Sequence, residues 1–404
     1  MPASLPLRIT AHTAVSALGA GLQAQEQALD ANRSGLSPLS AAGQGSEPEP
    51  VVGRLDTWVG RVNGLDQPLP EAWHAWDCRN HRLAWMALQQ DGFTQAVNHA
   101  VNDHGADRVA VVLGSTTSSV GATEAAYRTL NATGVFPRGP NDHRLHNLHA
   151  LSAFVAEALG ARGPCFTVST ACSSSAKAFV SARRLLALGL ADAVVVGGVD
   201  SLCGSTLFGF HALQLVSAQP CRPFDTDRSG INLGEAAGFA LLERGSGGLQ
   251  LLGCGESSDA HHLSAPQPEG LGMQAALAAA LADARRPPES VDYLHAHGTA
   301  TPKNDAIEAH LIHRHFTHDM PVSSTKGLTG HTLGAAGILG AVFSLMAIER
   351  GVLPGTVGTQ NVLPEVAPRL LLRSRRQTVH TAVSHAFAFG GSNCVLVFGR
   401  GDTT

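Results

Sequence analysis

Two continuous apolar runs constrain the fold of this chain more than any other feature. They are Val109-Ala-Val-Val-Leu-Gly114 and Ala193-Val-Val-Val-Gly-Gly198, each ended by glycine. Such runs are typical of strands buried on both faces of a parallel sheet, whose strands need helices as crossover connections. The sequence between the two runs has helical patterns, so it predicts an α/β protein. The glycine-rich break at 245–248 separates two comparable halves, which we place at residues 1–248 and 249–404.

Composition bounds the class of protein. Apolar residues make up 44% of the 404 residues and charged residues 15%, so the chain is rich in core and is not disordered. A net charge of −4 without a basic tail argues against nucleic acid as a partner. No signal sequence and no run of 18 apolar residues are recognised, so no membrane span is expected. Seven scattered cysteines favour reduced thiols and a cytoplasmic location.

One cysteine stands where a strand gives way to a helix. Cys165 to Val168 is a short apolar run, and the helical pattern extends from Ser173 to about Leu190. We expect Cys172 to be the first residue of this helix, where unpaired N–H groups and the helix dipole favour a nucleophilic thiolate. The alternative is a small buried cysteine without chemical function.

Three later segments resemble a known family. They are His295-Ala-His297-Gly-Thr-Ala-Thr-Pro302, the glycine-rich run from Ser324 to Gly337, and Phe387-Ala-Phe389-Gly-Gly-Ser-Asn393. Together with the Cys172 stretch, they resemble the β-ketoacyl-[acyl-carrier-protein] synthases in order and spacing, over nearly the whole chain. The resemblance implies a thiolase-like fold, in which two pseudo-repeated halves form a five-layer αβαβα sandwich.

The resemblance also implies a reaction, the decarboxylative Claisen condensation of an acyl thioester held on Cys172 with malonyl-acyl-carrier protein. The oxyanion hole is expected from the backbone N–H groups of Cys172 and Phe389. His297 and His331 are expected to bind the malonyl thioester and stabilise its enolate, with Lys326 orienting them. Neither a cofactor nor a metal is expected, because the phosphopantetheine arm arrives on the acyl-carrier protein.

Further residues match family positions around the phosphopantetheine arm and the acyl chain. They are Thr299, Thr301, Ser264, His262, Phe387, Phe210 and Thr117. Core packing is an alternative explanation for Phe210. Thr117 lies in the loop 115–119, which we expect to reach the acyl pocket of a partner subunit and to limit chain length.

The resemblance implies a dimer, either of two copies or with a related condensing subunit. We expect an obligate dimer whose sheets join through the strand Ala193–Gly198 and its neighbours, because this continuous apolar run is too buried in pattern for an exposed edge. The sequence leaves open which kind of partner completes the dimer.

Three other patterns have alternative interpretations. Asp305 and Glu308 either support the histidines or form a helix capping box, and we favour the capping box. Arg79 and Arg82, on a helix predicted over 73–98, either meet an acidic partner or belong to a solvated face. The histidines between 310 and 318 match no standard metal spacing, so we favour an exposed helix end over a metal site.

The sequence departs from the family at positions that bear on its pathway. Gly340 stands where many relatives carry glutamate, which predicts an altered rate or altered ion binding near the histidines. Arg228-Ser-Gly-Ile231 and Asn304 also differ from common fatty-acid synthesis enzymes. These departures favour a specialised pathway, such as aryl polyene or polyketide-like synthesis.

Three competing functions remain to be weighed. A non-catalytic chain-length-factor subunit usually lacks the nucleophile, whereas Cys172, His297 and His331 are all present. A degradative thiolase needs a second reactive cysteine near its C-terminus, and Cys394 lies in a predicted strand instead. An acyl-CoA-priming synthase carries asparagine in place of the second histidine.

Overall fold

The strands of the two halves form one long sheet. The structure, a computed structural model, describes residues 6–41, 55–137, 139 and 142–401. The first half supplies β1 (Leu7–Ser16), β5 (Val109–Gly114), β6 (Cys165–Val168), β7 (Ala193–Asp200) and β9 (Ala236–Arg244). The second half supplies β10 (Gly248–Ser258), β11 (Tyr293–His295), β12 (Val322–Ser323), β15 (Thr381–Ala388) and β16 (Ser392–Gly401).

The two halves share one topology. From one end, β6, β5 and β7 run parallel, and β9 and β1 follow antiparallel. From the other end, β12, β11 and β15 run parallel, and β16 and β10 follow antiparallel. The halves meet between β1 and β10 through the single register pair Arg8 and Gln250. Each half thus repeats the same arrangement of five strands, in the same chain order.

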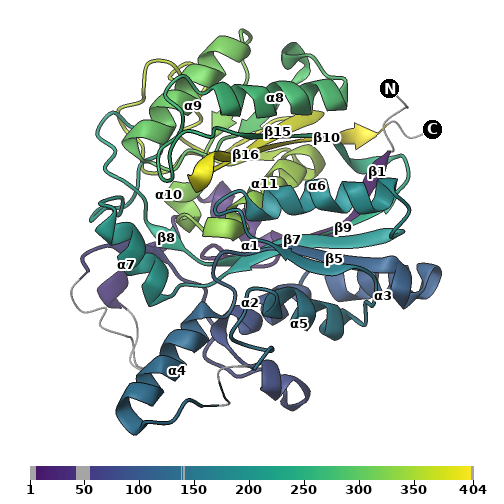
Figure 1. Cartoon of the computed structure of the whole chain (residues 1–404). Helices are drawn as coiled ribbons and strands as arrows, with labels where there is room; N and C mark the ends of the chain where they lie inside the picture. The colour runs from purple at the N-terminus through teal and green to yellow at the C-terminus, as the bar shows by residue number, and fades with distance from the viewer. Residues whose placement is uncertain (1–5, 42–54, 138, 140–141, 402–404) are drawn as a thin grey trace.

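Helices separate and cover the two five-stranded halves, which gives five layers (Figure 1). The central layer holds α6 (Ser174–Ala187) and α11 (Ala336–Arg350). One outer layer holds α2 (Arg79–Leu88), α3 (Phe93–His104) and α5 (Ala150–Leu159), and the other holds α8 (Leu271–Ala284) and α9 (Pro302–His315). The predicted thiolase-like αβαβα sandwich is confirmed.

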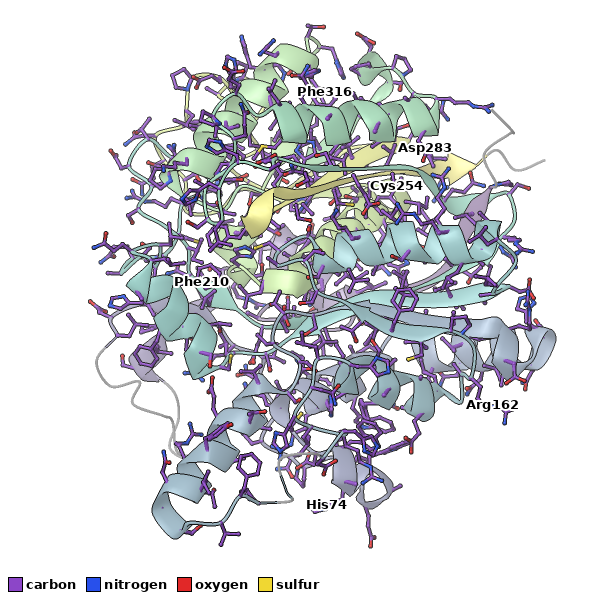
Figure 2. The ribbon with its side chains drawn as sticks, in the orientation of Figure 1. His74, Arg162, Phe210, Cys254, Asp283 and Phe316 are labelled. Carbon is purple, nitrogen blue, oxygen red and sulfur yellow. The ribbon has the colours of Figure 1, made fainter. Side chains whose placement is uncertain are left out.

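Three apolar clusters correspond to the spaces between these layers. The central cluster combines α6 and α11 with both halves of the sheet, and the other two lie beneath the outer helices. Polar contacts fasten the outer layer to the sheet as well. Cys254 on β10 and Asp283 on α8 lie side by side (Figure 2), where the Asp283 carboxylate accepts the N–H of Cys254 at 2.9 Å.

Helix α11 and the turn before it are apolar enough to cross a membrane by length and composition. This segment, Leu333–Arg350, is nevertheless 83% buried inside the molecule. Its place between the two halves of the sheet accounts for its composition, because a helix covered on all sides needs no polar face.

The predicted dimer strand is wrong. β7, which contains Ala193–Gly198, pairs with β5 on one side and with β9 on the other. It therefore has no free edge for another subunit. Among the described residues, the strand at the end of this half is β6, which pairs with β5 alone and is half-buried. The long apolar run identified a central strand and not an edge.

The fold also contains three further helices and a small sheet. The helices are α4 (Val120–Thr133), α7 (Gly204–Ala212) and α10 (Lys326–Thr329), and the small sheet contains β3 (Leu36–Pro38), β4 (Trp58–Gly60) and β8 (Leu233–Gly234). The helix predicted over 73–98 is divided into α2 and α3, because Gly92 adopts a left-handed conformation with φ of 70°.

Candidate active site

Cys172 lies in the turn between β6 and α6. The helix begins at Ser174, two residues later than expected, so Cys172 precedes the helix instead of opening it. Ala171 has a positive φ of 51°, which turns the chain sharply before the nucleophile. The thiol is buried, with 5% of the residue exposed. The strand and the helix therefore fix the thiol from both sides.

His331 contacts this thiol directly, with 3.1 Å between its Nε2 and Sγ of Cys172. Its main chain pairs with β8: its N–H donates to Asn232 O at 2.7 Å, and its carbonyl accepts from Gly234. The Nδ1 atom accepts the N–H of Leu333 at 3.3 Å. Because Nδ1 acts as acceptor in a neutral ring, the proton lies on Nε2 and points at the sulfur.

His297 completes the reactive group, with its ring 5.5 Å from that of His331 and nearly perpendicular to it. Its backbone is held at two points: the N–H donates to Glu308 Oε1 at 2.7 Å, and the carbonyl accepts from Nζ of Lys326. Burial, followed by the charge of Lys326, lowers the pKa of both His297 and His331 well below the usual value. Both rings are therefore neutral hydrogen-bonding groups at physiological pH.

Burial dominates the ionisation of the nucleophile. It raises the pKa of Cys172 to about 11, while the charge of Lys326 and the backbone N–H groups of Phe389 and Cys172 lower it. The expected thiolate at a helix terminus is therefore outweighed by desolvation. The same two N–H groups reach the sulfur, which places both predicted oxyanion donors beside the reacting atom.

A cavity of about 340 Å³ leads to the thiol. Its lining includes ten of the predicted residues: Cys172, Phe210, His262, Ser264, His297, Thr299, Thr301, His331, Phe387 and Phe389. Lys326 lies behind this lining, where it holds the carbonyl of His297. Thr299 and Thr301 join their hydroxyls at 2.8 Å, and the rings of Phe210 and Phe389 lie 5.7 Å apart. The predicted residues thus make up ten of the 23 described residues that line this cavity.

Thr117 does not line this cavity; its hydroxyl donates to the buried carboxylate of Asp200 at 2.8 Å. Its expected place at the acyl pocket of a partner subunit stays a prediction. The preferred interpretation of Asp305 and Glu308 is wrong. Asp305 and Glu308 do not form a capping box. Thr301, the N-cap of α9, makes no side-chain cap, and the carboxylates instead bind the main chain around His297 and Ala300. Both acids therefore support the active-site loop.

Sequence reasoning missed several residues of the site. Ile231, Leu215 and Met273 line the cavity, and their apolar side chains carry no sequence signal that separates them from the core. His385 was also missed, although a histidine in the apolar strand β15 is a visible anomaly. Its ring binds Glu308, directly behind His297.

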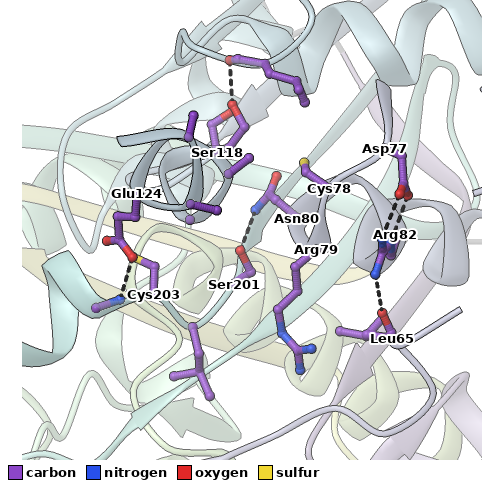
Figure 3. A pocket seen from close by; sticks show the side chains of 18 of the residues that line it. Leu65, Asp77, Cys78, Arg79, Asn80, Arg82, Ser118, Glu124, Ser201 and Cys203 are labelled. Atoms are coloured by element: carbon purple, nitrogen blue, oxygen red, sulfur yellow. Dashed lines mark hydrogen bonds and ion pairs between the residues drawn. The ribbon is translucent and has the colours of Figure 1, made fainter. Parts of the chain in front are cut away.

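The two arginines of α2 are internally neutralised. Arg79 forms two hydrogen bonds with the buried Glu235, at 2.9 and 2.6 Å, and Arg82 pairs with Asp77. Both line a second cavity, of about 440 Å³, between α2, α4 and α7 (Figure 3). Glu124 lies across this cavity and accepts from the first N–H groups of α7. Arg79 and Arg82 therefore form neither a solvated helix face nor an unpaired basic patch.

The three reactive side chains also resemble a metal site. One donor atom from each of Cys172, His297 and His331 lies within 4.8 Å of the others, a set of ligand types that suits zinc. The ammonium group of Lys326 lowers the pKa of both histidines, and the same repulsion disfavours a bound cation. We therefore assign the three side chains to acyl transfer.

Comparisons with known proteins agree with the geometry. Two family models match: Beta-ketoacyl synthase, N-terminal domain, over residues 6–247, and Beta-ketoacyl synthase, C-terminal domain, over residues 250–360. Nodulation protein E of Rhizobium sp. (strain N33) is 37% identical over 313 residues, which cover 74% of this chain and 77% of that protein. The 3-oxoacyl-[acyl-carrier-protein] synthase 2 of a Synechocystis strain is 33% identical over 326 residues, 75% of this chain and 78% of that enzyme.

A solved structure of a ketosynthase is similar to this chain over nearly its full length. A ketosynthase in complex with its chain length factor, from Xenorhabdus doucetiae, has a TM-score of 0.85 at 35% identity and covers 99% of both chains. Fold and site together define a condensing enzyme. The chain belongs to the β-ketoacyl synthase family. Its class of reaction is carbon–carbon bond formation in fatty-acid or polyketide elongation.

Proposed function

We propose that the protein extends an acyl chain held on Cys172 by condensation with malonyl-acyl-carrier protein. The observation that carries this proposal is the 3.1 Å contact between Cys172 Sγ and a neutral His331, with His297 beside it. An intact nucleophile with both histidines argues against a non-catalytic chain-length-factor subunit. The phosphopantetheine arm on the carrier supplies the thioester, so no resident cofactor is required.

In the first half-reaction, the sulfur of Cys172 attacks the acyl thioester. The N–H groups of Cys172 and Phe389 stabilise the oxyanion, and each such donor typically lowers a barrier by about 3 kcal/mol. The carrier thiolate leaves and takes the proton of the Cys172 thiol. The acyl group is then a thioester of Cys172, and the free carrier departs with its thiol.

In the second half-reaction, the malonyl thioester loses carbon dioxide and becomes an enolate. The Nε2–H of His331 and the ring of His297 are close enough together to share the enolate oxygen. The enolate carbon attacks the acyl group on Cys172, which forms the new carbon–carbon bond and releases the Cys172 thiolate. Lys326 and Glu308 keep His297 in place during this step.

Separate measurement of the two half-reactions tests the proposal. Intact mass after mixing with a panel of acyl-carrier proteins should show one acyl adduct on the parent and none on Cys172→Ser. His297→Ala and His331→Ala should keep the adduct but lose decarboxylation of malonyl-acyl-carrier protein. An adduct on Cys172→Ser would contradict the assignment of the nucleophile. The acyl lengths accepted by the parent decide between fatty-acid and polyene-like substrates.

We further propose that the active form is a dimer with a related condensing subunit, in the cytoplasm. The solved ketosynthase of Xenorhabdus doucetiae carries a chain length factor, and this chain offers β6 as an edge strand. Helix α4 projects beside the body of the molecule (Figure 1), with Tyr127 56% exposed and Val135 just beyond it 66% exposed. Exposed large apolar side chains on a projecting helix are typical of an interface.

Helix α4 and the residues after it up to Val135 form the projecting arm. Substitutions on this arm test the dimer. Tyr127→Lys and Val135→Lys should lower the molar mass measured by light scattering, with the chain alone and with its co-expressed partner. The matched control is Leu188→Lys, since Leu188 is 72% exposed at the end of α6 and belongs to no such arm. A dimer that survives both arm substitutions would contradict the proposed interface.

A further inference from the structure

A buried histidine outside the reactive trio makes a specific contact behind it. His385 lies on β15, two residues before Phe387 and four before Phe389. Its side chain has no exposure, and Nδ1 lies 3.0 Å from Oε1 of Glu308. Its Nε2 is also buried and has no hydrogen-bond partner among the described residues. Packing alone does not explain this ring, because an unpartnered buried nitrogen costs stability that an apolar side chain avoids.

The carboxylate that His385 contacts is fully buried and organises the loop of His297. Oε1 of Glu308 accepts the N–H of His297 at 2.7 Å, and Oε2 accepts the N–H of Gly298 at 2.7 Å. On the other side of the residue, Lys326 binds the His297 carbonyl. The position of the Glu308 carboxylate therefore sets the position of the His297 backbone, and with it the imidazole.

His385 is the link between this carboxylate and the strand that carries the oxyanion turn. Nδ1–H donates to Glu308, while the ring packs against Phe387 with 4.9 Å between ring centroids. Phe387 in turn contacts the ring of His297 at 6.1 Å. His385 thus reaches His297 by two routes, through the carboxylate and through an aromatic ring.

We propose that His385 is a positioning residue for the second half-reaction: by donating to Glu308 it fixes His297 in the geometry that stabilises the malonyl enolate. This inference rests on the proposed function of His297. It assigns no role to His385 in acylation of Cys172, because the thiol is aligned by the turn before α6 and by His331. Loss of His385 should consequently separate the two half-reactions.

Three variants test the donor and its position. His385→Ala removes the donor. His385→Asn places an amide N–H close to the position of Nδ1. His385→Gln preserves bulk and polarity but moves the N–H further along the side chain. We expect about tenfold to hundredfold slower decarboxylation of malonyl-acyl-carrier protein in the Ala and Gln variants, because small displacements of catalytic groups have effects of that size. The Asn variant should recover most of the parent rate.

A matched control separates positioning from general destabilisation. His81 on α2 is also fully buried, with Nδ1 2.7 Å from Trp76 O and Nε2 without a partner among the described residues. His81→Ala should lower the melting temperature but leave the ratio of the two half-reaction rates at the parent value. His385→Ala should change that ratio at least tenfold through kcat for decarboxylation, with acyl transfer to Cys172 within about twofold.

The outcomes distinguish this inference from the proposed function. A parent protein that never acylates Cys172 would overturn the proposed function itself. A parent with both half-reactions, but His385 variants that lose both equally or neither, would overturn the positioning role alone. An Asn variant as slow as the Ala and Gln variants would also overturn it, since the donor to Glu308 would then be irrelevant. If His385→Ala does not fold, the comparison of Asn with Gln decides the question.

Discussion

The ionisation of the nucleophile Cys172 is coupled to the charge of Lys326. Burial raises the pKa of Cys172 to about 11, and the charge of Lys326 is the largest influence that lowers it. Burial also lowers the pKa of Lys326, whereas the charges of Glu308 and Cys172 raise it. Lys326 therefore has two functions in the geometry: its Nζ holds the carbonyl of His297, and its charge makes the thiolate accessible.

We predict that Lys326→Met slows alkylation of Cys172 by iodoacetamide at every pH between 6 and 9. The thiolate is the reacting form, so the rate falls about tenfold for each pKa unit gained when the nearby charge is removed. Peptide mass spectrometry over time measures the rate at each cysteine. Cys254 serves as internal control, since its pKa depends on burial and on Arg183 and not on Lys326. Equal rates at Cys172 in both proteins would contradict the coupling.

The sequence predicted the reactive residues well because each belongs to a motif with a fixed local conformation. Cys172, His297 and His331 come from three distant segments, and the fold brings them together as the resemblance implied. The supporting residues were harder to predict. A carboxylate near the start of a helix looks the same in the sequence whether it caps that helix or binds a neighbouring loop, so Asp305 and Glu308 were misinterpreted. The partner of His385 depends on which face of β15 is buried, and the sequence alone does not show this.

Among helices and strands, the sequence predicted their kinds more reliably than their neighbours. Continuous apolar runs identified β5 and β7 as buried strands. The same property led to the wrong dimer strand, because burial on both faces says nothing about which strand lies at an edge. The half-buried β6, only four residues long, carries a weaker pattern and nonetheless occupies that edge.

Gly340 on α11 illustrates how packing explains a departure that the motif left open. A Cβ atom at this position would lie 2.6 Å from Oγ of Ser384 and 3.0 Å from Nδ1 of His295. These two side chains occupy the space into which a larger residue would project. The glutamate expected from relatives is therefore excluded here by packing between α11 and the strands β15 and β11.

We predict that Gly340→Ala destabilises the protein by about 1–3 kcal/mol, the usual range for overpacking a core. Denaturant unfolding measures the change. The matched control is Gly209→Ala in α7, where a Cβ would meet no atom within 4 Å, so a gain of about 0.5–1 kcal/mol is expected. Gly340→Ala combined with Ser384→Ala should recover part of the loss. A stable Gly340→Ala protein would show that the helix and strands can separate without cost.

In the molecule as a whole, buried titratable groups are distributed over both halves. Burial raises the pKa of all seven cysteines: to about 12 for Cys78 and Cys221, to about 11 for Cys165, Cys172, Cys203 and Cys254, and well above its usual value for Cys394. Burial lowers the pKa of several histidines, to about 4 for His81 and about 3 for His295. Burial raises the pKa of Asp305 to about 6. Its protonation at low pH therefore favours the folded protein and opposes the effect of the histidines on stability.

These shifts predict a stability plateau between about pH 6.5 and 9. Below pH 6.5 the unfolded chain binds protons on histidines that stay neutral when folded, so stability falls; His81 alone contributes roughly 3 kcal/mol between its two pKa values. Above pH 9 the unfolded chain ionises thiols that stay protonated when folded, and stability falls again. Melting temperatures from pH 4 to 11 measure both sides. His81→Asn should flatten the acid side only, and Cys221→Ala the alkaline side only. A melting temperature that stays constant from pH 9 to 11 would mean that the buried thiols ionise as readily in the folded protein as in the unfolded chain.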